Sequence, residues 1–118
     1  MQDYKNLKVW KRGHTLVLLI YKLTQDFPKD ETFGLINQLK RSVVSVPANI
    51  AEGAGRKTQN DFAHFLNIAL GSLNESSYYI LLSKDLQYID EKNYNNLDKE
   101  INEVKAMLIA LINSVRRK

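Results

Sequence analysis

The stretch INQLKRSVVSVPANIAEG at residues 36–53 decides the fold of this chain. Its apolar residues recur every three or four positions and would line one face of an α-helix; they are Ile36, Leu39, Val43, Val46 and Ile50. This period runs across Pro47 without interruption. Since proline removes one backbone hydrogen bond and its ring crowds the preceding turn, we expect one continuous helix that is kinked at Pro47.

Turn signals flank this helix on both sides. Pro28 precedes it, and the acidic pair at residues 30–31 supplies an N-cap candidate and negative charge that suits a helix dipole. We therefore expect the helix to begin near Glu31. The Gly-Ala-Gly run at residues 53–55 should end it, and Thr58 opens a shortened capping box that predicts the start of another helix.

The same apolar period predicts three further helices. The first runs from Leu7 to Asp26 and has a single apolar seam. The third, over residues 59–86, carries two seams and should contact two neighbours, while Asp90 caps the fourth. Helices joined by such short connections run antiparallel. We therefore expect one domain over residues 1–118, an all-α, antiparallel, up-down-up-down four-helix bundle.

Composition argues against several classes of protein. No apolar stretch approaches the roughly 20 residues that span a bilayer, and the chain has no cysteine for disulfides, thiolate metal sites or nucleophiles. Neither His14 nor His64 has a carboxylate three or four positions later, as a helical metal site would require. We expect a cytoplasmic protein that has no membrane segment, metal, cofactor or catalytic residue and is not an enzyme.

Positive charge is concentrated in the first half of the chain. The net charge is +4, and residues 1–57 hold ten lysines and arginines against five acids, whereas residues 58–118 hold seven against eight. Such an excess can mark a phosphate-binding surface, although a mildly basic solvated face has the same composition. The candidate nucleic-acid-binding residues are Lys8, Lys11, Arg12, Lys40, Arg56 and Lys57.

A second candidate is a polar cluster on the helices that meet at the turn near Arg56. Glu75 lies on an apolar seam of the third helix, so its carboxylate needs a partner. A symmetric antiparallel pairing brings Glu75 beside Gln38 and, one turn along, Arg41 or Ser42. We expect a buried, charge-assisted contact there, with a ligand-facing or intersubunit role as the alternative. The cluster comprises Arg41, Ser42, Asn49, Glu52 and Glu75.

Several of these motifs occur together in one known family. The run Leu-Lys-Val-Trp-Lys at residues 7–11, the run Gln-Leu-Lys-Arg-Ser at residues 38–42 and above all Pro-Ala-Asn-Ile-Ala-Glu-Gly at residues 47–53 carry the resemblance. The chain resembles the four-helix bundle proteins encoded in intervening sequences of 23S ribosomal RNA genes, over residues 7–86. Lys40 stands where an arginine is usual, which keeps the charge and loses the planar fork that binds phosphate with two hydrogen bonds.

The resemblance implies a ring, typically a homopentamer, with no established enzymatic activity. A related accessory protein of diversity-generating retroelements is similar in fold and binds nucleic acid and a reverse transcriptase. Surplus apolar residues also favour a homo-oligomer; they are Leu18, Leu19, Tyr78, Tyr79, Ile109 and Ile112. Three functions stay open: a ring that binds RNA or DNA, which we favour; a structural oligomer that scaffolds a protein partner; and an enzyme.

Overall fold

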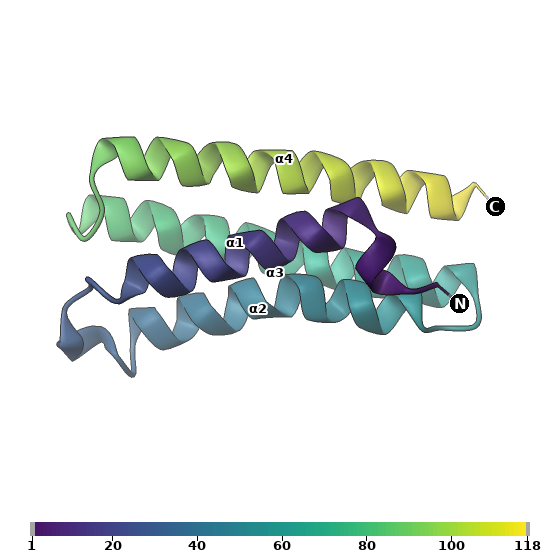
Figure 1. Ribbon diagram of the computed structural model, residues 1–118, viewed down its shortest axis with the longest axis horizontal. Helices are drawn as coiled ribbons and strands as arrows, with labels where there is room; N and C mark the ends of the chain where they lie inside the picture. Colours follow the sequence, from purple (N-terminus) through teal and green to yellow (C-terminus); the bar gives the residue numbers. More distant parts are fainter. Residues whose placement is uncertain (1, 118) are drawn as a thin grey trace.

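Four long helices make up the computed structural model, which describes residues 2–117 (Figure 1). Helix α1 spans Lys8–Thr24, α2 spans Leu35–Ala54, α3 spans Gln59–Asp85 and α4 spans Glu91–Arg116. Two short 3₁₀ turns, Tyr4–Asn6 and Lys29–Glu31, precede α1 and α2. No strand occurs in the described part of the chain. The predicted all-α four-helix bundle is confirmed.

Consecutive helices run in opposite directions along the long axis (Figure 1). In α2 and α3 the paired side chains show this directly, because Ser42 faces Ser76 whereas Ser45 faces Ser72. Each helix packs against the next one in the chain, and α1 also packs against α4, so α1 and α3 lie on one diagonal. Both chain ends and the α2–α3 turn therefore share one end of the bundle, and the other two connections share the opposite end.

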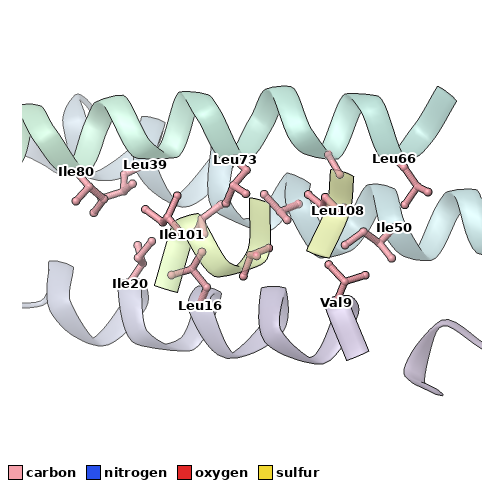
Figure 2. Close-up of a cluster of buried hydrophobic side chains, with 14 of the residues drawn as sticks. Val9, Leu16, Ile20, Leu39, Ile50, Leu66, Leu73, Ile80, Ile101 and Leu108 are labelled. Atoms are coloured by element: carbon pink, nitrogen blue, oxygen red, sulfur yellow. The ribbon is translucent and has the colours of Figure 1, made fainter. Parts of the chain in front are cut away.

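The apolar seams meet along the bundle axis and form its core (Figure 2). All five seam residues predicted for α2 are buried. One seam of α3 is buried along its whole length, and so is most of the seam of α4; their buried residues are Phe62, Leu66, Ala69, Leu73, Ser76, Ile80 and Ser83 on α3, and Leu97, Ile101, Val104, Leu108 and Val115 on α4. The predicted α4 seam included Tyr94 and Leu111, which are only half-buried. Ile112, predicted as surplus apolar surface, is buried instead and is not available to another subunit. Across residues 2–117, no helix is apolar over a length that would cross a bilayer.

Helix α2 starts one turn later than predicted. It begins at Leu35, because residues 29–31 form a separate 3₁₀ turn and Gly34 leaves the helical conformation with φ −108° and ψ −110°. The Glu31 carboxylate accepts a hydrogen bond from the Leu35 N–H at 3.3 Å. The acidic residue thus caps the helix from outside its first turn.

Pro47 lies inside the continuous helix α2 and is buried. Helix α1 approaches it closely, because a Cβ atom added at Gly13 would lie 3.5 Å from Val46 Cγ1 and 3.8 Å from Pro47 Cδ. The continuity of the helix is as expected, and the kink at Pro47 stays a prediction.

Two glycines provide a matched test of helix packing. At Gly53 of α2, an added Cβ would lie 2.8 Å from Phe65 Cβ and 3.2 Å from the Phe62 carbonyl oxygen of α3, whereas no atom lies within 4 Å of a Cβ added at Gly71. Both positions are helical. Alanine therefore gains helix propensity at both positions but meets the backbone of α3 only at Gly53.

We expect Gly71→Ala to raise the free energy of unfolding by about 0.5–1 kcal/mol. Gly53→Ala should lower it by about 1–3 kcal/mol, because the overlap with α3 outweighs the gain in propensity. Urea denaturation of both variants at one protein concentration, followed by circular dichroism, measures the difference. Equal effects of the two substitutions would show that Gly53 is not a packing constraint.

Candidate nucleic-acid interface

The fold gathers basic residues from three segments at the end of the bundle that holds both chain ends. The N-terminal segment is fixed there, since the Gln2 N–H donates to the Ala54 carbonyl oxygen at 2.9 Å. Seven basic residues lie at this end against the three acids Asp3, Glu52 and Asp61. We call it the basic end; its basic residues are Lys5, Lys8, Lys11, Arg56, Lys57, Arg116 and Arg117.

The opposite end, formed by the α1–α2 and α3–α4 connections, has the reverse balance. It carries six acids against four lysines and is called the acidic end. Its acids are Asp26, Asp30, Glu31, Asp85, Asp90 and Glu91, and its lysines are Lys22, Lys29, Lys84 and Lys92. The bundle measures 45 Å along its longest dimension, so its charge is segregated over a considerable distance.

Four of the six candidate nucleic-acid-binding residues lie at the basic end: Lys8, Lys11, Arg56 and Lys57. Arg56 pairs with Glu52 at 3.2 Å, and its guanidinium carbon lies 4.7 Å from the centroid of the Phe65 ring. Both partners of this ion pair are about half exposed. Such surface pairs contribute little to stability, so a phosphate could replace Glu52 at small cost.

The other two candidates have different surroundings. Arg12 donates to Glu100 at 3.0 Å and also to Glu103, which joins α1 to α4; these hydrogen bonds, that to Glu103 foremost, raise the pKa of Arg12. The Lys40 ammonium lies 4.6 Å from the Tyr21 ring centroid. Lys40 is also sixteen residues from Arg56, which is about 24 Å along α2. Arg12 and Lys40 as phosphate ligands stay predictions.

A second surface feature is a polar groove between α2 and α3. It is a hollow of about 310 Å³ lined entirely by polar side chains, namely Gln38, Arg41, Ser42, Ser45, Ser72 and Glu75. The hydroxyls of Ser42 and Ser76 lie 2.9 Å apart at its buried floor. Above them the Ser72 hydroxyl donates to Ser45 Oγ at 2.8 Å. The polar groove thus has a floor of paired hydroxyls and exposed charged walls.

The prediction of a buried contact for Glu75 is wrong. Glu75 is exposed and accepts a hydrogen bond from the Tyr79 hydroxyl at 2.7 Å, and within residues 2–117 no ion pair joins it to Arg41. The cause is the register of the two helices. The numbers of facing residues sum to about 117. The predicted pairing of Gln38 with Glu75 assumed a sum of 113, so Gln38 faces Tyr79 instead, one helical turn further along α3. The second seam of α3 is therefore its half-exposed flank beside α2.

The predicted polar cluster is divided between three places. Arg41, Ser42 and Glu75 line the polar groove. Asn49 lies one turn further along α2, where its side-chain amide donates to the carbonyl and hydroxyl oxygens of Ser45 at 2.8 Å each, and Glu52 lies at the basic end. Ser45 and Ser72 were not predicted as site residues, because a serine inside a helix can equally be a small packing residue, and Tyr79 was predicted as surplus apolar surface although its hydroxyl bonds to Glu75.

Each histidine packs against an aromatic ring of its own helix. His14 stacks on Trp10 with ring centroids 5.1 Å apart, and His64 lies edge-on to Phe65 at 5.5 Å. Within residues 2–117, no group of three or more histidines and carboxylates is arranged to hold a metal ion.

Comparisons with known proteins place this bundle among similar chains. A family model described as 23S rRNA-intervening sequence protein matches residues 5–110. A crystal structure from Bacteroides thetaiotaomicron, described as a protein with unknown function from the S23 ribosomal protein family, superimposes with a TM-score of 0.83. It shares 28% sequence identity, and the match covers 89% of this chain and 95% of that one. A search of curated proteins returns no match.

The Glu75–Tyr79 contact generates a prediction about pH. The hydrogen bond to Glu75 stabilises the protonated phenol of Tyr79 and raises its pKa above the ordinary value of 10.0, and ionisation would also put two negative charges side by side. Glu75→Gln removes one of those charges, so the pKa of Tyr79 should fall toward its ordinary value. Tyr88 is the internal control, since its hydrogen bond to Glu31 raises its own pKa and is untouched by the substitution. Carbon-13 NMR titration of ring-labelled tyrosine measures both, and an unchanged Tyr79 would contradict the contact.

Proposed function

The chain belongs to the family of 23S rRNA-intervening sequence proteins, and from this starting point we propose that it is a non-enzymatic, ring-forming helical bundle that binds RNA or another nucleic acid. It acts in the cytoplasm, and its phosphate contacts come from the basic end. The observation that carries the proposal is the excess of seven basic residues over three acids at that end.

A surface of this kind suits binding that does not depend on base sequence. Each lysine or arginine that neutralises a phosphate releases condensed counterions, so affinity depends steeply on salt concentration. Lys8, Lys11 and Lys57 are exposed, and within the described residues none of them forms an ion pair. Their charge is therefore available to a phosphate backbone without breaking an existing contact.

Assembly into a ring would multiply the basic end. A closed ring needs two different, mutually complementary surfaces on each subunit. Helices α1 and α3 lie on one diagonal of the bundle, and each exposes large apolar side chains: Leu18, Leu19 and Tyr21 on α1, and Ile68, Tyr78 and Leu81 on α3. Exposed apolar side chains on these two opposite sides support a heterologous ring, for which we propose five subunits; Val44 on α2 and Ile109 on α4 are exposed as well.

The same exposed apolar side chains favour the second candidate function, which is a structural oligomer that scaffolds a protein partner. Leu18 is 58% exposed and Tyr78 57% exposed, so both are available to a protein partner. This candidate needs no nucleic acid. A salt-dependent binding experiment separates the two functions.

We expect Arg56→Ala/Lys57→Ala to weaken binding to labelled single-stranded and duplex oligonucleotides. Each lost phosphate contact should flatten the slope of log affinity against log salt concentration by up to about one unit. Fluorescence anisotropy across a salt series measures both quantities.

The matched control removes the same charge from the other end of the molecule. Lys29→Ala/Lys92→Ala lies at the acidic end and should leave affinity and salt slope nearly unchanged. Equal losses in the two double variants would mean that only net charge matters. If the parent protein fails to bind at low salt, the scaffold function replaces nucleic-acid binding.

The ring makes a separate prediction about mass. Light scattering of the parent protein at micromolar concentration should report a multiple of 13.6 kDa, five-fold for a pentamer. Leu18→Lys on α1 or Tyr78→Lys on α3 should each shift the mass toward the monomer, because both put a charge into an apolar contact. Lys99→Glu on α4 is an exposed charge change and should have no effect. A parent protein of 13.6 kDa would refute the oligomer.

A further inference from the structure

We propose that the polar groove between α2 and α3 binds the hydrogen-bonding edge of a guanine base. This inference rests on the proposed nucleic-acid function and names the base that the bound strand would present. It is argued from the unused donors and acceptors of Gln38, Arg41, Ser45 and Glu75 around the hollow of about 310 Å³.

Glu75 supplies a fixed and partly unused carboxylate. The Tyr79 hydroxyl holds Oε2 at 2.7 Å, and within residues 2–117 no hydrogen bond occupies Oε1. The same phenol lies 3.4 Å from Gln38 Oε1, so it links both walls of the polar groove. A carboxylate only accepts hydrogen bonds, and this one is therefore oriented for a ligand that donates them.

Beside Glu75, Ser45 and Arg41 have hydrogen-bond donors without an acceptor within residues 2–117. Ser45 Oγ already accepts hydrogen bonds from Asn49 Nδ2 and Ser72 Oγ, each at 2.8 Å, so its remaining capacity is its own O–H donor. Arg41 is exposed, and among the described residues it has no carboxylate within 4.0 Å despite sharing the polar groove with Glu75. A ligand that fits the polar groove therefore needs an acceptor for Ser45 and Arg41, and this acceptor must lie next to the donors that bind Glu75.

Among the bases, guanine offers this combination along one edge. Its N1–H and N2–H donors are adjacent and suit a carboxylate, and its O6 acceptor lies beside them. Adenine presents an acceptor at N1, which a carboxylate repels, and uracil has a single N–H between two carbonyls. Guanine alone gives the carboxylate two adjacent donors and gives the neighbouring hydroxyl and guanidinium an acceptor, whereas adenine, cytosine and uracil each offer it one donor group beside an acceptor, so the polar groove favours guanine.

The charge and position of the polar groove agree with this assignment. It holds one guanidinium and one carboxylate, so it suits an uncharged edge better than a phosphate. Phosphates would instead contact the basic end, where Arg56 lies eleven residues beyond Ser45, about 16 Å along the axis. A strand held at the basic end could thus place one base in the polar groove.

The experiment compares GMP, IMP and AMP, which share a phosphate and differ in the edge that they present. Each is titrated into nitrogen-15-labelled full-length protein and followed by TROSY NMR. GMP should shift the amide signals of residues lining the polar groove and bind about tenfold tighter than AMP. IMP, which lacks the N2 donor, should fall between them.

Two variants locate the effect. Glu75→Gln should remove the preference for GMP, whereas Glu91→Gln at the acidic end makes the same charge change and should retain it. Arg56→Ala/Lys57→Ala should weaken oligonucleotide binding and leave the preference for GMP intact, which separates this inference from the proposed function.

Three results would overturn the inference. The first is equal affinity for GMP and AMP, and the second is a preference for GMP that survives Glu75→Gln. The third is a set of shifts in the polar groove that free glycine causes and GMP does not, because the ammonium and carboxylate of glycine would then pair with Glu75 and Arg41. If oligonucleotides bind while the polar groove gives no shift, the proposed function stands and this inference falls. If GMP shifts the polar groove while oligonucleotides do not bind, the inference stands and the proposed function falls.

Discussion

The contact of Phe65 with the bare backbone of Gly53 sets the geometry on which the other features depend. An added Cβ at Gly53 would lie 2.8 Å from Phe65 Cβ, so α2 and α3 approach as closely as side chains allow at this point. Once these two residues face each other, every other pair along the two helices is fixed. Ser45 then faces Ser72, and Gln38 faces Tyr79. The polar groove is a consequence of this register, since a shift of one turn would disperse its side chains.

Helix content could be predicted from the sequence because it depends on local periodicity. The buried seam of α2 and the caps at Thr58 and Asp90 follow from spacing and residue type, and the structure contains all of them. Register could not be predicted in the same way. A symmetric turn was the simplest assumption, yet the space left by a missing side chain at Gly53 decides the offset. An error of one turn was enough to bury Glu75 in the prediction and to expose it in the structure.

The candidate interface shows a related limit. Charge was compared between the two halves of the sequence, but each half of an antiparallel bundle visits both ends of the molecule. The physically relevant comparison is between the ends, because the N-terminal segment and the α2–α3 turn share one end of the bundle although they are distant in sequence. Arg12 is only one residue from Lys11, yet it contacts Glu100 and Glu103 of α4, which are 88 and 91 residues away in the sequence. Long-range pairing of this kind leaves no local trace in the sequence.

The segregation of side-chain charge gives the molecule a permanent electric dipole moment along its 45 Å axis. The backbone adds little to it, because the macrodipoles of antiparallel helices cancel in pairs. In the field of a polyanion such a subunit experiences a torque that turns its positive pole forward before contact. In a cyclic assembly the components parallel to the symmetry axis add and the perpendicular components cancel. If the bundles of the proposed ring stood along that axis, the ring would be electrically two-faced, and a polyanion would meet an attractive rim on one side only.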